Sequence, residues 1–364
     1  MIFANTVELG KSGEYLRRAL SCHHVRPWIR LPTLAIDVMS GDAGAAECLP
    51  GAALALHADP DLRLLLVGRP ESIVPLIESL PGEHRARVEL VAAASVVTMA
   101  EHPREAIRRR KDSSMRVAID LVKQGRAGGC VSSGNTGALT GMAHFVLKTV
   151  PQVERAPIMS AIPSALGHTY MLDLGANTTA TPEQLQQFAA MGSIVARDVY
   201  GVARPRIGLL NIGEEDIKGH ATVQSAHALI GATSLDYIGF VEGNDIFSGE
   251  VDVVVTDGFT GNVALKTMEG VAQLITTRMR EEFARSLPAR LAGLVARPVL
   301  RRAGQSLDPR RYNGACMVGL RGVVVKSHGR ADRVAFARAI QIARKAVLND
   351  LSGCVAQALA EQGS

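Results

Sequence analysis

Aromatic residues are scarce in this sequence of 364 residues, at 4% of the total. Proteins that bind RNA or single-stranded DNA often stack bases on aromatic side chains, so this scarcity argues against a nucleic-acid binder. Cysteine is also sparse, because the five cysteines lie far apart and form no C-x-x-C pair. The sequence therefore indicates neither a disulfide framework nor a zinc site, which fits a reducing cytoplasm.

Long apolar runs are missing too, since none approaches the roughly 18 residues that a membrane-spanning helix needs. The longest, residues 90–100, is interrupted by serine and threonine. Residues 1–30 carry several charges and lack the apolar core of a signal peptide. We interpret them as an N-terminal extension, followed by one domain at residues 31–350 and a C-terminal tail at 351–364.

Several familiar catalytic motifs are absent. The first predicted strand is not followed by G-x-G-x-x-G, and the chain has no P-loop, no G-x-S-x-G nucleophile elbow and no H-E-x-x-H. These absences remove the support for a nicotinamide enzyme, an NTPase, a serine hydrolase or a zinc protease.

Hydrophobic residues, in contrast, make up 47% of the chain, enough to fill a large core. Short runs rich in aliphatic residues alternate with helical patterns, and these runs occupy residues 34–39, 63–68, 88–93, 128–133, 170–176, 206–213, 236–242, 251–257 and 322–327. Apolar strands separated by helices are typical of a mostly parallel sheet with helices on both faces. The predicted fold class is therefore α/β.

Polar residues follow six of the predicted strands, at residues 37–42, 132–137, 175–179, 211–216, 257–262 and 326–329. In parallel sheets, ligands lie at the carboxyl ends of the strands. We therefore expect the six turns to converge on one cleft. The turn SSGNTG at 132–137 leads into a predicted helix, where its backbone amides can bind an anion, although Asn135 or Thr136 can equally serve as a helix cap.

The positive charge is concentrated at residues 278–311, which hold nine arginines against three acids, while the rest of the chain is close to neutral. In a helix, Leu291, Leu294 and Val295 share an apolar face, and the basic side is formed by Arg290, Arg297 and Arg301. With Pro288 and Pro298 expected to bend this segment, we predict a projecting helical hairpin. It suits an acidic carrier protein, an anionic membrane surface or an ordinary dimer contact.

Several long motifs together resemble one family, and they stand at residues 36–44, 111–115, 131–139, 172–192, 206–219, 242–270 and 319–332. In this order they are similar to those of the bacterial phosphate acyltransferases (acyl-acyl carrier protein:phosphate transacylases, PlsX), over residues 34–345. The chain departs from the family pattern at Ser40, Ala43, Ala45, Asn313 and Cys316.

The resemblance implies that inorganic phosphate attacks the thioester of a long-chain acyl-acyl carrier protein, giving acyl phosphate for glycerolipid synthesis. It implies a fold similar to isopropylmalate dehydrogenases and phosphotransacetylases, a homodimer, and no metal, nucleotide or other cofactor. A cytoplasmic enzyme peripherally associated with the inner face of the cell membrane, near a downstream membrane acyltransferase, is the matching expectation.

Such a reaction must desolvate phosphate and stabilise an oxyanion. We predict four catalytic residues: Asn135, Asn177, Lys266 and His328. His328 can protonate the departing thiolate or anchor its own loop. The predicted substrate-binding residues are Asp42, Ser132, Ser133, Gly134, Thr136, Asn211, Lys218, Asp257, Asn262 and Lys326, although Asp257 can also be a helix cap.

Two other functions stay open at this point. A short-chain phosphotransacetylase would use acetyl-coenzyme A in place of a carrier-bound long chain. A non-catalytic scaffold that binds acyl carrier or lipid would have no need for the polar turns or for Lys266.

Overall fold

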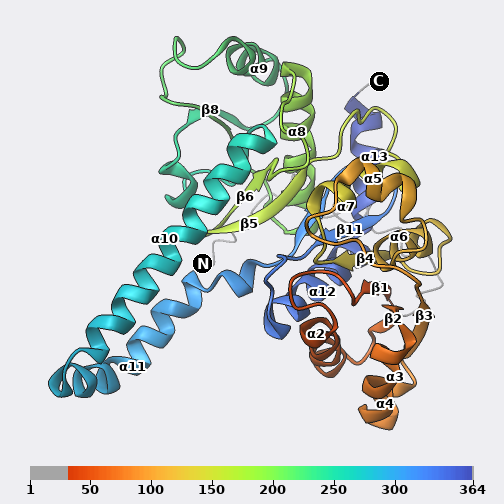
Figure 1. The fold of residues 1–364 in the computed structure, drawn as a ribbon. Helices are drawn as coiled ribbons and strands as arrows, with labels where there is room; N and C mark the ends of the chain where they lie inside the picture. The colour runs from red at the N-terminus through yellow and green to blue at the C-terminus, as the bar shows by residue number, and fades with distance from the viewer. Residues whose placement is uncertain (1–31, 363–364) are drawn as a thin grey trace, which may run out of the picture. The chain divides into compact units, whose positions relative to one another are not determined.

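An 11-stranded sheet runs through residues 32–362, the part of the chain that the computed structural model describes (Figure 1). Its strands follow the order β3-β2-β1-β4-β11-β10-β5-β6-β9-β7-β8. In chain order they are β1 (Thr33–Asp37), β2 (Arg63–Gly68), β3 (Val88–Ala92), β4 (Gly129–Ser132), β5 (Ile158–Ser164), β6 (Gly167–Leu172), β7 (Ile207–Leu210), β8 (Tyr237–Val241), β9 (Val253–Val255), β10 (Ala315–Met317) and β11 (Val323–Lys326). Most neighbouring strands are parallel, which confirms the predicted α/β class.

Two strands that the sequence does not predict, β5 and β10, reverse the direction of the sheet. β10 is antiparallel to both β11 and β5, and β5 is antiparallel to β6. Strands β6, β9 and β7 therefore run opposite to β1, β4 and β11. The six turns therefore do not all follow strands of one direction, as a parallel sheet would require: three follow β1, β4 and β11, and three follow β6, β7 and β9.

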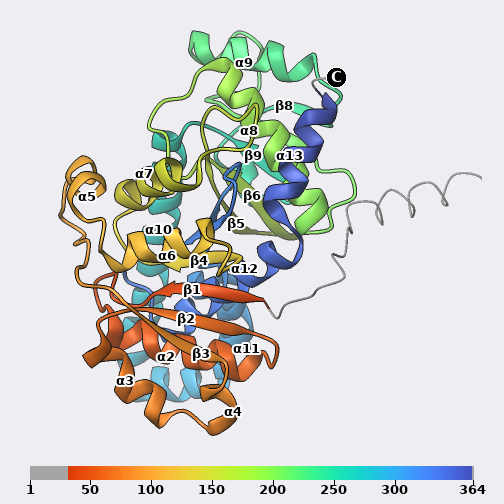
Figure 2. The same ribbon diagram turned by 90° about the vertical axis from the view of Figure 1, so that its right-hand side faces the viewer.

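Helices cover both faces of the sheet. In Figure 1, α2 (Ala45–Ala58) and α12 (Arg333–Leu348) lie on one side of β1 and β4, and α6 (Ser114–Lys123) lies on the other. Figure 2 shows α8 (Pro182–Ile194) beside α13 (Leu351–Gln362). The remaining helices are α3 (Pro70–Ser79), α4 (Gly82–Arg85), α5 (Pro103–Arg109), α7 (Thr136–Leu147), the π-helical η1 (Val195–Val199), α9 (Ala221–Gly231), and the 3₁₀ turns η2 (Asp245–Phe247) and η3 (Pro309–Tyr312).

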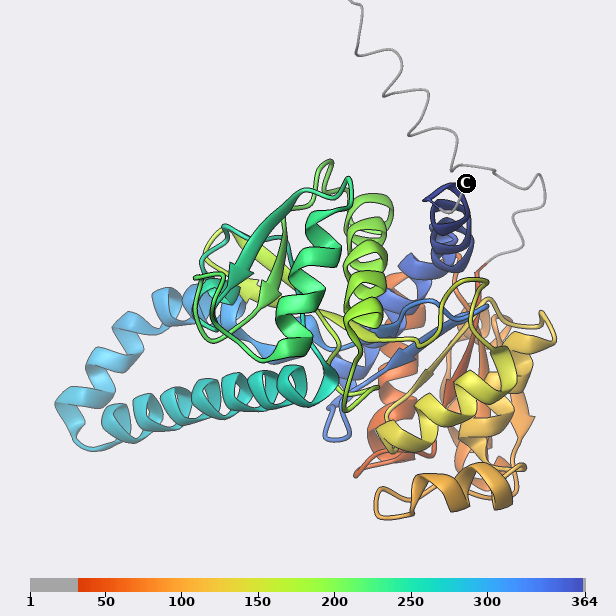
Figure 3. The ribbon, with the colours of Figure 1, turned by 90° about the horizontal axis from the view of Figure 1, so that it is seen from above.

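The predicted helical hairpin is confirmed. Its helices, α10 (Gly258–Ala284) and α11 (Leu287–Leu307), pack against each other and extend away from the sheet (Figure 3). The Ser286 hydroxyl caps α11 by accepting from the N–H of Ala289, and Pro298 lies inside α11 without ending it. Pro288 lies at the start of α11, beside the bend of the hairpin, as predicted, whereas the bend expected at Pro298 does not end the helix.

The structure describes the C-terminal end of the chain up to residue 362, but not its first 31 residues. The predicted N-terminal extension, residues 1–30, lies outside the described residues. The segment expected as a C-terminal tail contains helix α13, which buries Leu351, Val355 and Leu359. Because α13 packs on α8 and η1, this segment belongs to the core of the fold.

Candidate active site

A buried carboxylate joins the turns that follow β1 and β4. Asp37, fully buried at the end of β1, accepts hydrogen bonds from the hydroxyls of Ser132, at 2.7 Å, and Ser40. The backbone N–H of Met39 also donates to it. Burial raises the pKa of Asp37, and the hydroxyl and N–H donors oppose that change. The carboxylate thus fixes the position of the SSGNTG turn relative to the first turn.

The turn after β11 interlocks with these two. The Ser133 hydroxyl donates to the carbonyl of Ser40 at 2.6 Å, and the N–H of Asp42 donates to the carbonyl of Gly329 at 2.9 Å. Gly41 lies between Ser40 and Asp42 and has a φ of 91°. A Cβ at this position would stand 2.6 Å from the hydroxyl oxygen of Ser133. Only glycine fits this backbone conformation and this space. Three of the predicted turns therefore form one rigid group.

Lys326 places a cation against this group. Its Nζ donates to the carbonyl oxygens of Ser133, at 3.4 Å, and Ser327. Burial lowers the pKa of Lys326 to about 8, with the charge of Lys266 acting in the same direction and Asp42 and Asp37 opposing it. An anion bound here would restore the charged form, so Lys326 is suited to holding phosphate.

His328 contacts two residues of α10. Its Nε2 lies 3.0 Å from Lys266 Nζ and 3.5 Å from the Glu269 carboxylate, and Lys266 Nζ donates to Glu269 at 2.7 Å. The other ring nitrogen, Nδ1, accepts from the backbone N–H of Arg330 at 3.1 Å. Because an acceptor nitrogen carries no proton, a neutral imidazole carries its proton on Nε2, which then faces the Glu269 carboxylate as a donor and forms no hydrogen bond with the Lys266 ammonium, since both groups are donors. His328 thus presents an N–H toward α10.

Glu269 is the anionic partner of both side chains. Burial alone would raise its pKa, but hydrogen bonds from His328 and Lys266, and their charges, lower the pKa to about 2. Glu269 therefore stays ionised and holds Lys266 and His328 side by side.

Replacing Glu269 by glutamine is expected to lower the free energy of unfolding at neutral pH by about 1 kcal/mol, because two partly exposed donors lose a charged partner. Folding depresses this pKa, so the contribution is complete above the unfolded value and is lost as pH falls from about 4.5 toward 2. Urea unfolding at pH 7 and near pH 3 measures the difference from the unmodified protein. A difference that does not shrink at the lower pH would contradict this account.

A second buried carboxylate organises the turn after β6. Asp173 accepts hydrogen bonds from the backbone N–H groups of Ile158, Gly175, Ala176 and Asn177, at 2.7–3.1 Å. The side-chain amide of Asn177 donates to the same carboxylate at 2.9 Å. Burial raises the pKa of Asp173, and these donors oppose the change. The side chain that the sequence predicts as catalytic, Asn177, is buried and holds this turn in place.

The start of α10 packs on that turn. The N–H of Gly258 donates to the carbonyl of Asn177 at 2.8 Å, and a Cβ on Gly261 would lie 2.0 Å from the carbonyl oxygen of Asp173. One and a half turns further along the helix, Lys266 reaches His328. Helix α10 therefore connects the turns of the two strand directions, and it brings the turns after β6 and β9 to the group that contains Lys326.

Two predicted site residues cap helices. The Asn135 oxygen accepts from the N–H of Ala138 at 3.0 Å, while its amide donates to the carbonyls of Met99 and Glu101. Asp257 caps α10 by accepting from the N–H and the hydroxyl of Thr260. Their side chains have the capping role that the sequence leaves open.

The other predicted residues occupy different places. Gly134 donates from its N–H to the Ser132 hydroxyl at 3.2 Å, and Thr136 is the first residue of α7. Asn211 donates to the carbonyls of Gly213 and Lys218 within the turn after β7. Asp42 forms an exposed ion pair of 3.4 Å with Arg330, and Asn262 is an exposed residue beside Gly175.

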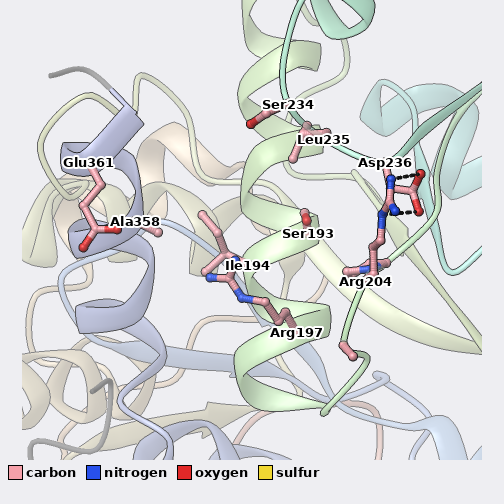
Figure 4. Close-up of a pocket in the computed structure, with 11 residues that line it drawn as sticks. Ser193, Ile194, Arg197, Arg204, Ser234, Leu235, Asp236, Ala358 and Glu361 are labelled. Carbon is pink, nitrogen blue, oxygen red and sulfur yellow. Dashed lines mark hydrogen bonds and ion pairs between the residues drawn. The ribbon is translucent and has the colours of Figure 1, made fainter. Parts of the chain in front are cut away.

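Two cavities lie apart from the Lys266–His328 contact. One of about 320 Å³ borders the turn after β6 and is lined by Arg155, Gln184, Thr222 and residues 179–182. Figure 4 shows the other, of about 280 Å³, where Arg204 pairs with Asp236 at 3.0 Å. Its lining combines residues that directly precede β7 and β8 with residues of α8, η1 and α13, so this second cavity lies at the end of these two strands away from the predicted turns.

Comparison with known proteins decides the family. The family described as "Fatty acid synthesis protein" matches residues 32–353. A phosphate acyltransferase of Methylococcus capsulatus is 51% identical over 317 residues, 87% of this chain and 94% of the relative. That of Alkalilimnicola ehrlichii is 53% identical over 311 residues, 85% and 91% of the two chains. This chain belongs to the phosphate acyltransferase family.

Solved structures support the fold of this phosphate acyltransferase. A phosphotransacetylase from Streptococcus pyogenes is similar with a TM-score of 0.59 at 14% identity, over 93% of this chain and 99% of that one. A branched-chain phosphotransacylase from Enterococcus faecalis gives 0.55 at 15% identity, over 87% and 99%. The expected similarity to phosphotransacetylases is confirmed at the level of the fold.

For a phosphate acyltransferase, sequence reasoning misses three residues of interest. Glu269 stands one helical turn after Lys266, a spacing that favours an ion pair and gave a usable signal. Asn313 and Arg155 had no such signal, because the partners of Asn313 lie in the turn after β11 and in α12, and Arg155 borders a cavity formed with residues that follow β6. Within residues 32–362 no cluster of possible metal ligands and no helix able to span a membrane is found.

Proposed function

We propose that this phosphate acyltransferase transfers a long-chain acyl group from acyl carrier protein to inorganic phosphate, giving acyl phosphate for glycerolipid synthesis. The observation that carries the proposal is the meeting of Lys266, His328 and Lys326 beside three interlocked glycine turns. Two cations and an N–H donor in one place suit a phosphate nucleophile and a thioester oxyanion.

The reaction balances without a covalent enzyme intermediate. An oxygen of HPO₄²⁻ attacks the thioester carbonyl carbon, so that a C–O bond forms and the C–S bond breaks. The proton of the phosphate ends on the carrier thiol, and the acyl phosphate leaves with two negative charges. The enzyme must therefore desolvate and orient phosphate and stabilise the oxyanion, rather than supply a proton of its own.

In this proposal Lys326 and the backbone amides of the SSGNTG turn hold phosphate. Lys266 and the Nε2–H of neutral His328 donate to the developing oxyanion. Protonation of the thiolate by His328 would require an imidazolium, whose Nδ1–H would displace the hydrogen bond from the Arg330 N–H. The donor role needs no such rearrangement, so it is preferred to the acid role.

The test uses purified enzyme, palmitoyl-acyl carrier protein and phosphate. Free thiol is followed spectroscopically, and acyl phosphate is trapped with hydroxylamine. Phosphate-dependent formation of both products supports the proposal. Activity with acetyl-coenzyme A alone would favour a short-chain phosphotransacetylase, and silence with both donors would overturn acyl transfer by these residues.

We further propose that the hairpin formed by α10 and α11 lies on an anionic membrane surface, where it releases the insoluble product. Leu294 and Val295 are 62% and 82% exposed, and Leu287, Leu291 and Val299 are exposed on the same helix. Arg290 and Arg297 stand among them. Apolar side chains interspersed with arginines suit the interface of an anionic bilayer.

That this enzyme forms a homodimer stays a prediction. Sedimentation equilibrium would measure its oligomeric state.

Leu294→Glu is expected to reduce binding to vesicles of anionic phospholipid by about tenfold, because it removes apolar contact and adds a repelled charge. Flotation of the enzyme with vesicles measures the bound fraction. Leu166→Glu is the matched control, since Leu166 is 82% exposed in the turn between β5 and β6. Equal vesicle binding by the two variants would refute the membrane role, and a raised KM for acyl carrier in the Leu294 variant alone would indicate a carrier surface instead.

A further inference from the structure

Asn313 occupies a buried position between η3 and β10. It is 9% exposed, and each polar atom of its side chain is used. Its Nδ2 donates to the hydroxyl of Ser327 at 2.9 Å and to the carbonyl of Ala335 at 2.7 Å, while its Oδ1 accepts from the backbone N–H of His328 at 2.8 Å. The orientation of the amide is unambiguous, because a carbonyl requires a donor and an N–H requires an acceptor.

These bonds join three segments that are distant in the sequence. Ser327 and His328 belong to the turn after β11, and Ala335 lies in the first turn of α12. Ser327 is fully buried, and its N–H donates to the carbonyl of Ser132 at 2.9 Å. The main chain of His328 is therefore fixed from one side by Asn313, while its ring is held by the Arg330 N–H and by Glu269.

We propose that Asn313 is the positioning residue of His328. It holds the backbone of residue 328 so that the imidazole Nε2–H lies beside Lys266 and points to the reacting carbonyl. This inference rests on the proposed function, in which His328 donates to the oxyanion. Displacing such a donor by about 1 Å costs up to 100-fold in rate without abolishing substrate binding.

Alternative donors do not replace Asn313. Without its side chain, the N–H of His328 loses its partner in a buried place, where an unsatisfied polar group is costly, while the carbonyl of Ala335 keeps only its hydrogen bond within α12. The turn is then expected to shift so that the His328 N–H reaches water. Asn313→Asp keeps an acceptor for the His328 N–H and can accept from the Ser327 hydroxyl, but it cannot donate to Ala335. The aspartate variant should therefore retain part of the geometry.

The experiment measures kcat and KM for Asn313→Ala, Asn313→Asp, His328→Ala and the double variants, with palmitoyl-acyl carrier protein and phosphate. Asn313→Ala is expected to lower kcat by about 10- to 100-fold while KM for the acyl donor changes by less than about threefold. Asn313→Asp should retain at least about threefold more kcat than the alanine variant. In the His328→Ala background, either change at Asn313 should have almost no further effect on kcat.

Equal losses in both backgrounds would overturn the proposal, because Asn313 would then act independently of His328. Asn349→Ala is the control, since the Asn349 amide donates to the carbonyl of Lys345 on the exposed end of α12. Circular dichroism tests whether each variant is folded. If Asn313→Ala unfolds, the effect of Asn313→Asp on kcat is compared between the unmodified enzyme and the His328→Ala variant instead. An unmodified enzyme that forms no acyl phosphate would refute the proposed function, whereas an active His328→Ala variant that loses no kcat would refute only the role of His328 and Asn313.

Discussion

Replacing Lys266 by alanine is expected to lower kcat/KM for phosphate-dependent thiol release by about 100-fold or more, because a charged donor beside the oxyanion is lost. The ammonium lies 3.0 Å from His328 Nε2 and is held by Glu269 at 2.7 Å. It is half-exposed, so its removal leaves no buried group without a partner. Steady-state kinetics with varied acyl carrier and phosphate would measure the loss, and thermal unfolding should change by only a few degrees.

Two further variants serve as controls for the loss of activity expected in Lys266→Ala. Lys123→Ala removes an exposed lysine from the last turn of α6 and should leave the kinetics unchanged. Lys266→Arg keeps the charge but spreads it over a larger planar group, so it should recover only part of the activity. If Lys266→Ala retains full kcat and KM, Lys266 is not part of the site, and the oxyanion must be stabilised by His328 and backbone amides alone.

The helix that carries Lys266 explains how a sheet with two strand directions builds one site. Because β5 and β10 reverse the sheet, the turns after β6 and β9 follow strands that run opposite to β1, β4 and β11. Helix α10 begins against the turn after β6 and reaches the turn after β11 at Lys266. The hairpin begins with this same helix and returns as α11, so the surface that we propose to lie on a membrane is covalently continuous with the site.

The sequence predicts the strands that are mostly apolar, and each of these is present, including β9 with three residues. It misses β5, a strand of seven residues that contains Pro163 and polar residues, and β10, a strand of three residues that contains no β-branched residue. Both owe their place to pairing with neighbouring strands rather than to their own pattern. Strand direction follows from these two strands, so the arrangement of the turns could not be read from hydrophobic periodicity alone.

The site, like the sheet, contains residues that the sequence predicts and residues that it does not predict. Lys266, Lys326 and His328 are recognisable as chemistry-bearing residues in polar turns, and the structure brings them together. Asn135 and Asp257 stand at strand-to-helix junctions, where a cap and a ligand need the same residue types, so the sequence could not separate the two roles. Asn313 could not be predicted because its partners come from α12 and from the turn after β11.

Gly261→Ala is expected to destabilise the enzyme by about 2–4 kcal/mol, although alanine is the better helix former. A Cβ at this position would lie 2.0 Å from the carbonyl oxygen of Asp173 and 3.0 Å from Thr256, so α10 must move away from the turn after β6. The same movement would carry Lys266 away from His328. We therefore expect Tm to fall by about 5 °C or more, together with a large loss of kcat.

Gly270→Ala, nine residues further along α10, is the matched control because a Cβ there meets nothing within 4 Å. This substitution should raise stability by about 0.5–1 kcal/mol through helix propensity and leave the kinetics unchanged. Two identical changes in one helix are thus expected to have opposite signs, and scanning calorimetry with the thiol-release assay would measure both. If Gly261→Ala were as stable and active as Gly270→Ala, α10 would not be fixed by the turn after β6, and the connection between the two groups of turns would have to lie elsewhere.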